Sequence, residues 1–257
     1  MTTLSQLGHL ALRAFLRFIR QPGQLFFALA FPLVFLAVVA SGLDRASLLP
    51  GFPADSYLDF MLAIPFVHGS LFVAVTAAVE LGRDIETGFL NRLALTPATG
   101  VALVLGNLVG AAMLGLLQFS VYLGAGLAAG ADFKSGPLGV PVLFLLAALI
   151  ALAFGAVGTT IALRTGSSEA VQGIFPLFFV LLFLSSMNLP RNLIEADWFH
   201  AVATVNPVSY LIEGLRSLVI VGWDAQALAL AFGFVLATIT VALAASAAAF
   251  RVRLTRT

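Results

Sequence analysis

Few side chains in this chain of 257 residues are able to do chemistry. It has three histidines, His9, His68 and His200, a single lysine, Lys134, and no cysteine. None of the histidines lies in an HExxH zinc motif, and no G-x-x-x-x-G-K-[ST] sequence is present that would cradle a nucleotide. The absence of cysteine removes thiolate metal sites and cysteine nucleophiles. The chain therefore predicts a protein that is not an enzyme and holds no cofactor or metal of its own.

The composition predicts a membrane protein. Hydrophobic residues make up 61% of the chain, charged residues only 10%, and the mean hydropathy is +1.07. Soluble domains are roughly a quarter charged, so a water-soluble globule is excluded. The net charge of +1 gives no general attraction to nucleic acid.

The elements that must position these residues are uncharged runs long enough to cross a bilayer, which takes about 20 residues of helix. Six runs qualify, and they are Leu25 to Leu43, Phe60 to Val79, Val101 to Ala131, Gly136 to Leu163, Ala170 to Pro190 and Ala225 to Phe250. We therefore expect an all-α polytopic membrane protein with six transmembrane helices.

The distribution of arginine and lysine predicts the orientation, because cytoplasmic loops retain these residues. With the N-terminus inside, nine of them face the cytoplasm and four lie outside. We expect both termini in the cytoplasm, a location in the cytoplasmic membrane, and a first span that acts as an uncleaved anchor.

The segment before the first span has the pattern of an amphipathic helix. Arg13, Arg17 and Arg20 recur at intervals of three and four residues, opposite an apolar arc that includes Phe15 and Ile19. This pattern favours a helix lying in the membrane interface over residues 1–23. The alternative is an ordinary positively charged flank that happens to be helical.

The loop between the second and third spans contains a short apolar stripe. Ile85, Phe89 and Leu93 are four residues apart, with Leu90 beside them. A short helix with such a stripe needs a surface that buries it. Two surfaces remain open, a soluble partner or the headgroups and neighbouring helix ends of the membrane.

The segment 188–224, after the fifth span, predicts a pair of short helices on the outer side. The uncharged part from Trp198 to Ile212 is too short to cross alone and is interrupted by Asn206 and Pro207. We expect a re-entrant or interfacial helical hairpin, or in the simpler alternative a plain outer loop.

Two motifs in these segments carry a resemblance to a known family. ETGFLNRLALTP after the second span and VNPVSYLIEGLR in the outer segment resemble the cytoplasmic loop and the outer Asn-Pro-x-x-Tyr signature of the ABC-2 type transporter permeases, the membrane subunits of ATP-driven exporters of the daunorubicin-resistance type. The outer match rests on Asn206, Pro207, Tyr210, Glu213 and Arg216. The similarity covers the whole chain, which would form one transmembrane domain over residues 1–257, with a six-span bundle over 24–250 and a cytoplasmic tail over 251–257.

The resemblance implies a coupling helix and a partner. The coupling helix would dock on a separate ATPase subunit, which would bind ATP and Mg²⁺. Its residues would be Arg83, Asp84, Ile85, Glu86, Thr87, Gly88, Phe89, Leu90, Arg92, Leu93, Thr96 and Pro97. Two ATPase copies and a second permease chain, identical or related, would complete the transporter.

The same resemblance places a translocation path along spans one, two and five. The candidate residues are His68, Phe175, Phe178, Phe179, Phe183, Ser185, Ser186, Met187 and Asn188. Aromatic and methionine surfaces suit bulky apolar molecules, so we expect a lipid or drug-like cargo, although phenylalanines that only pack or face lipid fit the pattern too. His68, alone among titratable groups near the middle of a span, is expected to be a neutral ring hydrogen-bonded to a neighbouring helix, with proton coupling as the alternative.

Two other functions compete with the exporter. An ATP-independent secondary transporter would place charged groups and broken helices at mid-membrane, whereas the charges here cluster at the span ends. A membrane scaffold is the second competitor. A neighbouring reading frame that encodes a protein with a phosphate-binding loop would favour the exporter.

Overall fold

The computed structural model describes residues 8, 12, 15–16, 19–88 and 100–254. The chain is 82% helical, and the described part contains no strand. The principal helices are α2 (Pro22–Gly42), α3 (Tyr57–Met61), α4 (Ala63–Glu86), α6 (Gly100–Ala128), α7 (Gly136–Thr165), α8 (Ser168–Phe183), α9 (Asp197–Val205), α10 (Pro207–Ile220) and α11 (Ala225–Leu254), with two short 3-10 helices at Asp44–Leu48 and Arg191–Leu193.

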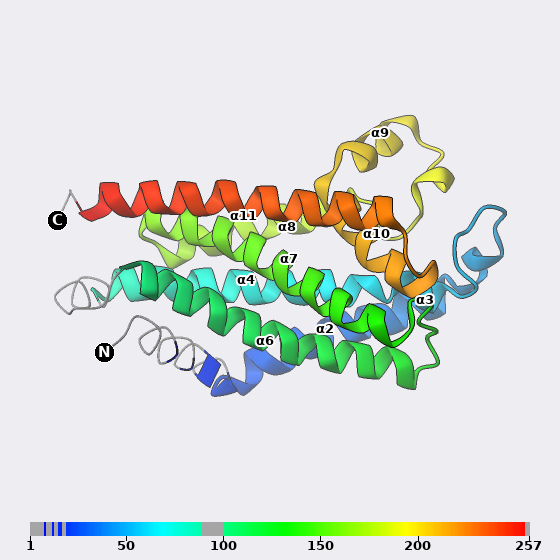
Figure 1. Cartoon of the computed structure of the whole chain (residues 1–257), viewed down its shortest axis with the longest axis horizontal. Helices are drawn as coiled ribbons and strands as arrows, with labels where there is room; N and C mark the ends of the chain where they lie inside the picture. The colour runs from blue at the N-terminus through cyan, green and yellow to red at the C-terminus, as the bar shows by residue number, and fades with distance from the viewer. Residues whose placement is uncertain (1–7, 9–11, 13–14, 17–18, 89–99, 255–257) are drawn as a thin grey trace.

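The long helices form one bundle around α4 (Figure 1). α4 packs against α2, α6, α7, α8 and α10, while α11 lies on the outside against α7 and α10. The segment Tyr57–Glu86 is accordingly 83% buried, against 17% for Ala225–Ala249. In Figure 1, α3, α9 and α10 gather at one end of the bundle, which we call the hairpin face, and α11 ends at the opposite terminal face.

A neighbouring helix satisfies the carbonyl that a proline leaves free in α2. Pro32 lies inside α2 and has no N–H, so the carbonyl of Ala28, four residues earlier, loses its helical donor. The hydroxyl of Tyr122 on α6 donates to that carbonyl at 2.7 Å. A hydrogen bond from another helix therefore replaces the one that Pro32 removes.

The expected crossings are present, but one is short. Five segments are long and apolar enough to span a membrane, and they are Leu25–Gly42, Tyr57–Glu86, Val109–Ala128, Gly136–Thr165 and Ala225–Ala249. The crossing predicted over Ala170 to Pro190 is helical only in α8, whose 16 residues extend about 24 Å at 1.5 Å per residue. The remaining residues leave the helix because side chains of α10 satisfy the carbonyls at its end, as described below.

The N-terminal segment is described only in part. Leu12, Leu16 and Ile19 are helical and exposed. The backbone amide of Arg20 donates a hydrogen bond to the carbonyl of Leu16 at 3.1 Å. Arg13 and Arg17 lie outside the described residues. Placement of this helix in the membrane interface stays a prediction.

Candidate functional site

The predicted coupling segment starts in the last turn of α4, which ends at a glycine cap. Gly88 has a φ of 68°, a left-handed conformation that glycine adopts without strain. The amide of Thr87 donates to the carbonyl of Arg83 at 2.9 Å, and the amide of Gly88 donates to that of Ile85 at 3.0 Å. These bonds close the last turn of α4.

Half of the predicted docking residues follow this cap and lie outside the described residues. They are Phe89, Leu90, Arg92, Leu93, Thr96 and Pro97. Their assignment to a coupling helix stays a prediction.

The described part of the segment is joined to the start of α8. Oε1 of Glu86 accepts hydrogen bonds from the amide of Ser168 at 2.6 Å and from its hydroxyl at 3.0 Å. A carboxylate is favourable there because the N-terminus of a helix carries unpaired N–H groups and partial positive charge. Gly82 permits the close approach, since a Cβ at this position would lie 2.8 Å from the amide nitrogen and the Cα of Ser168. The end of α4 is thus hydrogen-bonded to the beginning of α8, and we call this contact of Glu86 and Gly82 with Ser168 the joint between α4 and α8.

The remaining residues of the segment differ in exposure. Ile85 is buried in a cluster with Leu163 and Val171, so the chain itself covers this part of the expected apolar stripe. Arg83 is exposed and pairs with Glu80 at 2.9 Å, and Asp84 is half-buried.

On the hairpin face, Asn206 connects three helix ends. It joins α9 to α10, and its Oδ1 accepts a hydrogen bond from the amide of Val208 at 2.9 Å as the N-cap of α10. Its Nδ2 donates to the carbonyls of Leu181 at 2.6 Å and Leu184 at 3.0 Å. These carbonyls are at the C-terminal end of α8, where a helix leaves acceptors without donors. Pro207 occupies the first turn of α10, where its missing N–H costs nothing.

Arg216 is a buried cation that binds carbonyl oxygens. Its guanidinium donates to the carbonyls of Phe60 at 2.9 Å, Ser186 at 3.1 Å and Met187 at 3.0 Å, and lies 3.5 Å from the ring centroid of Phe60. Within the described residues no carboxylate forms an ion pair with it. Because a buried charge is tolerated only when it is hydrogen-bonded, Arg216 ties α3 and the segment after α8 to α10.

Glu213 and Tyr210 bind Arg191 instead. Arg191 Nε donates to Oε1 of Glu213 at 2.7 Å and Nη2 donates to Oε2, so the pair is bidentate. The hydrogen bonds that Arg191 donates to Glu213 raise the pKa of Arg191 above its usual value. The guanidinium also lies 4.7 Å from the ring centroid of Tyr210, and Oε1 of Glu213 accepts from the hydroxyl of Ser186 at 2.9 Å. Four of the five motif residues, all except Pro207, therefore contact the end of α8 or the segment between α8 and α9.

Seven of the nine predicted path residues fall into two groups. Phe175 and Phe179 of α8 meet His68 and Phe72 of α4, with ring centroids 4.9 to 6.2 Å apart. Ser185, Ser186 and Met187 are buried in the segment held by Arg216. The carbonyl of Asn188, in the same segment, accepts from the hydroxyl of Tyr57 at 2.5 Å.

Phe178 and Phe183 belong to neither group. Phe178 packs on Phe154 of α7 at 5.4 Å, and Phe183 is 51% exposed. The role of all these residues in a path stays a prediction.

Sequence reasoning missed part of the aromatic group. Phe27, Phe31 and Phe35 of α2 stack on one another, and Phe31 contacts both His68 and Phe179. The signal was present, because residues four apart share a helix face.

The expected hydrogen bond of His68 to a neighbouring helix is absent, since neither ring nitrogen has a partner of normal geometry in the described structure.

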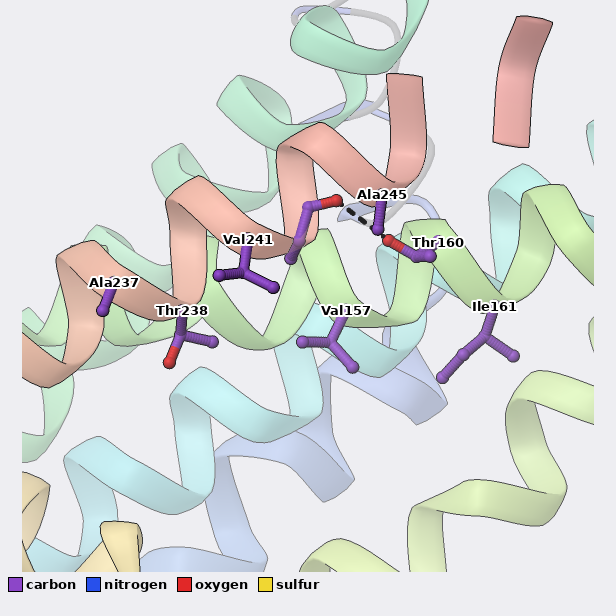
Figure 2. A pocket seen from close by; sticks show the side chains of 8 residues that line it. Val157, Thr160, Ile161, Ala237, Thr238, Val241 and Ala245 are labelled. Carbon is purple, nitrogen blue, oxygen red and sulfur yellow. Dashed lines mark hydrogen bonds between the residues drawn. The ribbon is translucent and has the colours of Figure 1, made fainter. Parts of the chain in front are cut away.

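An apolar groove lies between α7 and α11 (Figure 2). Its volume is about 440 Å³, and its walls are Val157, Thr160, Ile161, Ala237, Thr238, Val241, Ala242 and Ala245. The hydroxyl of Thr160 bonds to the carbonyl of Ala242 at 3.1 Å and to the hydroxyl of Ser246 at 2.7 Å. The groove therefore suits an acyl chain of the surrounding lipid better than a polar molecule.

The structure also bears on metal binding. No group of three or more acidic or histidine side chains that could hold a metal ion occurs in the part of the chain that is described. On the hairpin face Lys134 pairs with Asp132 at 2.8 Å and Asp55 at 3.3 Å, so these carboxylates already have a cation.

Comparison with known proteins gives consistent matches. The family model of the ABC-2 type transporter matches residues 5–220. The probable doxorubicin resistance ABC transporter permease protein DrrC of Mycobacterium tuberculosis is 27% identical over 156 residues, which cover 61% of this chain and 55% of the relative. The putative transport permease ycf38 of Cyanophora paradoxa is 27% identical over 222 residues, covering 84% of this chain and 74% of the relative. The chain thus spans about half the length of the mycobacterial relative.

The apolar helices define an integral membrane protein of the all-helical class. The chain belongs to the ABC-2 type transporter family, because the family model covers most of its length. Proteins of this family are membrane transport subunits, which are generally non-catalytic, and the ATPase activity of their transporters lies in a separate subunit.

Proposed function

We propose that the chain is the permease subunit of an ATP-driven exporter that moves a hydrophobic or amphipathic molecule, lipid or drug-like, across the cytoplasmic membrane. The residues from Arg83 to Pro97 dock on the ATPase, and both termini face the cytoplasm. Two ATPase copies, which bind ATP and Mg²⁺, and a second permease chain complete the assembly. The N-terminal helix lies in the interface and belongs to the same single domain.

The joint between Glu86 and Ser168 is the observation that supports this function best. Glu86 is the last residue of α4 and lies within the predicted docking segment, and Ser168 is the first residue of α8, which carries Phe175 and Phe179. A displacement of the docking segment by the ATPase would therefore be passed to α8 without an intervening flexible loop. ATP binding shifts the permease only if the ATPase contacts its conformations differently, and this joint offers such a contact.

The cargo class is supported by side-chain chemistry and by a relative. The aromatic group of α2, α4 and α8 consists of phenylalanines and one histidine, which suits apolar molecules. The mycobacterial relative is named for doxorubicin resistance, which is in keeping with a drug-like cargo for this chain.

Docking is tested by charge substitution in the predicted stripe. We expect Phe89→Asp or Leu93→Asp to reduce co-purification of the partner ATPase by more than about tenfold, because a carboxylate in an apolar contact is desolvated without a partner. Leu48→Asp is the matched control, since Leu48 is an exposed leucine on the opposite face. Undiminished co-purification of both stripe variants would reject the docking assignment. Full transport by the permease alone would instead favour a secondary transporter.

A further inference from the structure

His68 is buried without a hydrogen-bond partner. Its side chain lies on α4 and the residue is 1% exposed. Neither ring nitrogen makes a hydrogen bond of normal geometry within the described structure, and only a looser contact reaches the carbonyl of Ile64, one turn earlier on α4. A neutral imidazole has one N–H donor and one acceptor nitrogen. Burial of such groups without partners is unfavourable, and native structures rarely retain it without a reason. His68 is therefore expected to gain a partner in another state of the protein.

Phenylalanine rings surround His68 on the side that faces α2 and α8. Phe35, Phe31 and Phe179 have centroids 5.3, 5.7 and 5.7 Å from the imidazole. Phe72 and Phe175 extend the group through contacts with Phe179 at 6.2 and 4.9 Å. We call these five phenylalanines the phenylalanine cage.

No charged residue lies within two helical turns of His68 or Phe179 along their own helices. α2 contains none, and the nearest charged residue along α4 is Glu80, about 18 Å from His68 and about 12 Å from Phe72. On α8 the charged residue is Glu169, about 15 Å from Phe179 and about 9 Å from Phe175 by the same rise. A charged ligand would be desolvated there without a counter-charge. The cage therefore favours an uncharged ligand.

The cage is only partly covered by the rest of the protein, since its five phenylalanines are all half-buried. α2 and α8 meet here ring to ring, through Phe31 and Phe179, whose centroids are 6.2 Å apart. A molecule that separates these two rings would meet the imidazole, which contacts both of them.

We propose that the phenylalanine cage and His68 bind a flat, uncharged aromatic molecule that carries a hydroxyl or carbonyl group. The rings stack against its faces and edges, and the imidazole hydrogen-bonds its polar group. This site deepens the proposed function, on which it rests, by naming the cargo class.

The test uses the full chain in phosphatidylcholine nanodiscs, without the ATPase. Three fluorescent probes differ in one substituent: 1-hydroxypyrene, 1-methylpyrene and 1-pyrenemethylammonium. We expect 1-hydroxypyrene to bind about fivefold more tightly than 1-methylpyrene, the effect of one net hydrogen bond. The ammonium probe should bind most weakly.

Substitutions then assign the discrimination to His68. His68→Phe should lower the ratio of the two affinities to about one and leave the 1-methylpyrene affinity unchanged, while His68→Gln keeps part of the preference through its amide. Phe179→Leu should weaken all three probes. Phe144→Leu is the control, because Phe144 packs on Phe119 of α6, outside the cage.

The proposal is overturned if His68→Phe keeps the preference for 1-hydroxypyrene, if the ammonium probe binds best, or if Phe144→Leu and Phe179→Leu act alike. A change in self-association without a change in probe affinity would show that a second copy is the partner of His68, and would also reject the site. Should His68→Phe not insert, His68→Gln and Phe179→Leu decide the same question. Because no ATPase is present, failure of ATPase docking leaves this result unaffected.

Discussion

Arg216 stabilises the hairpin face through its three carbonyl acceptors. We predict that Arg216→Met destabilises the protein by about 3 to 5 kcal/mol, because three carbonyl oxygens lose their hydrogen-bond donor. Thermal unfolding of the purified chain in detergent measures this loss. Arg45→Met, at an exposed arginine of the same face, should leave the midpoint unchanged, and equal effects of the two variants would contradict the role of Arg216.

Asn206 allows its two functions to be separated. We predict that Asn206→Asp lowers stability by about 1 to 3 kcal/mol. The carboxylate still accepts from the amide of Val208 but no longer donates to the carbonyls of Leu181 and Leu184. In hydrogen exchange we expect the amides of α8 to lose protection while those of α10 stay protected. Loss of protection in α10 alone would mean that only the cap matters.

At the same scale, residue types were easier to predict than residue contacts. Arg216 and Glu213 were identified as motif residues in an apolar segment, but nothing in the sequence indicated their partners. In the structure Glu213 binds Arg191 and Arg216 binds carbonyls. No local pattern predicts which backbone groups a distant loop leaves free.

Among the elements, the joint between α4 and α8 can be tested by adding one methyl group. We predict that Gly82→Ala reduces ATP-driven transport several-fold while the ATPase still binds, because the new Cβ would overlap the backbone of Ser168 and overpacking shifts the helices apart. Transport into proteoliposomes with the partner ATPase measures the effect. Gly233→Ala is matched, since nothing lies within 4 Å of a Cβ there. Normal transport by Gly82→Ala would remove the joint from the mechanism.

The elements also show how far hydropathy reaches. Five of the six predicted crossings are present as long apolar segments, because the ability to cross a membrane depends on local composition. The fifth predicted span was placed too far toward Pro190, because α8 ends at Phe183 through bonds from Asn206, more than twenty residues later. The link from Glu86 to Ser168 joins residues 82 positions apart and has no signal in either segment.

For the whole molecule, the orientation is open to a direct test. The chain has no cysteine, so single replacements report without background. We predict that Asp132→Cys and Asp197→Cys are modified by a membrane-impermeant maleimide added outside cells, whereas Arg83→Cys and Arg92→Cys are protected until the membrane is opened. The side chains of Asp132 and Arg83 are 64% and 49% exposed, so protection of Arg83 would not result from burial. The reverse pattern would invert the topology.

The hydrogen bonds from Arg216 to backbone carbonyls have a consequence for biosynthesis. The chain is made from its N-terminus, so the backbone around residues 181–187 is synthesised well before Asn206 and Arg216, which satisfy it. Until α10 has been synthesised, the carbonyls of this stretch have to accept hydrogen bonds from water, lipid headgroups or the insertion machinery. We therefore expect α8 to reach its final depth late, as a step that follows translation of the hairpin.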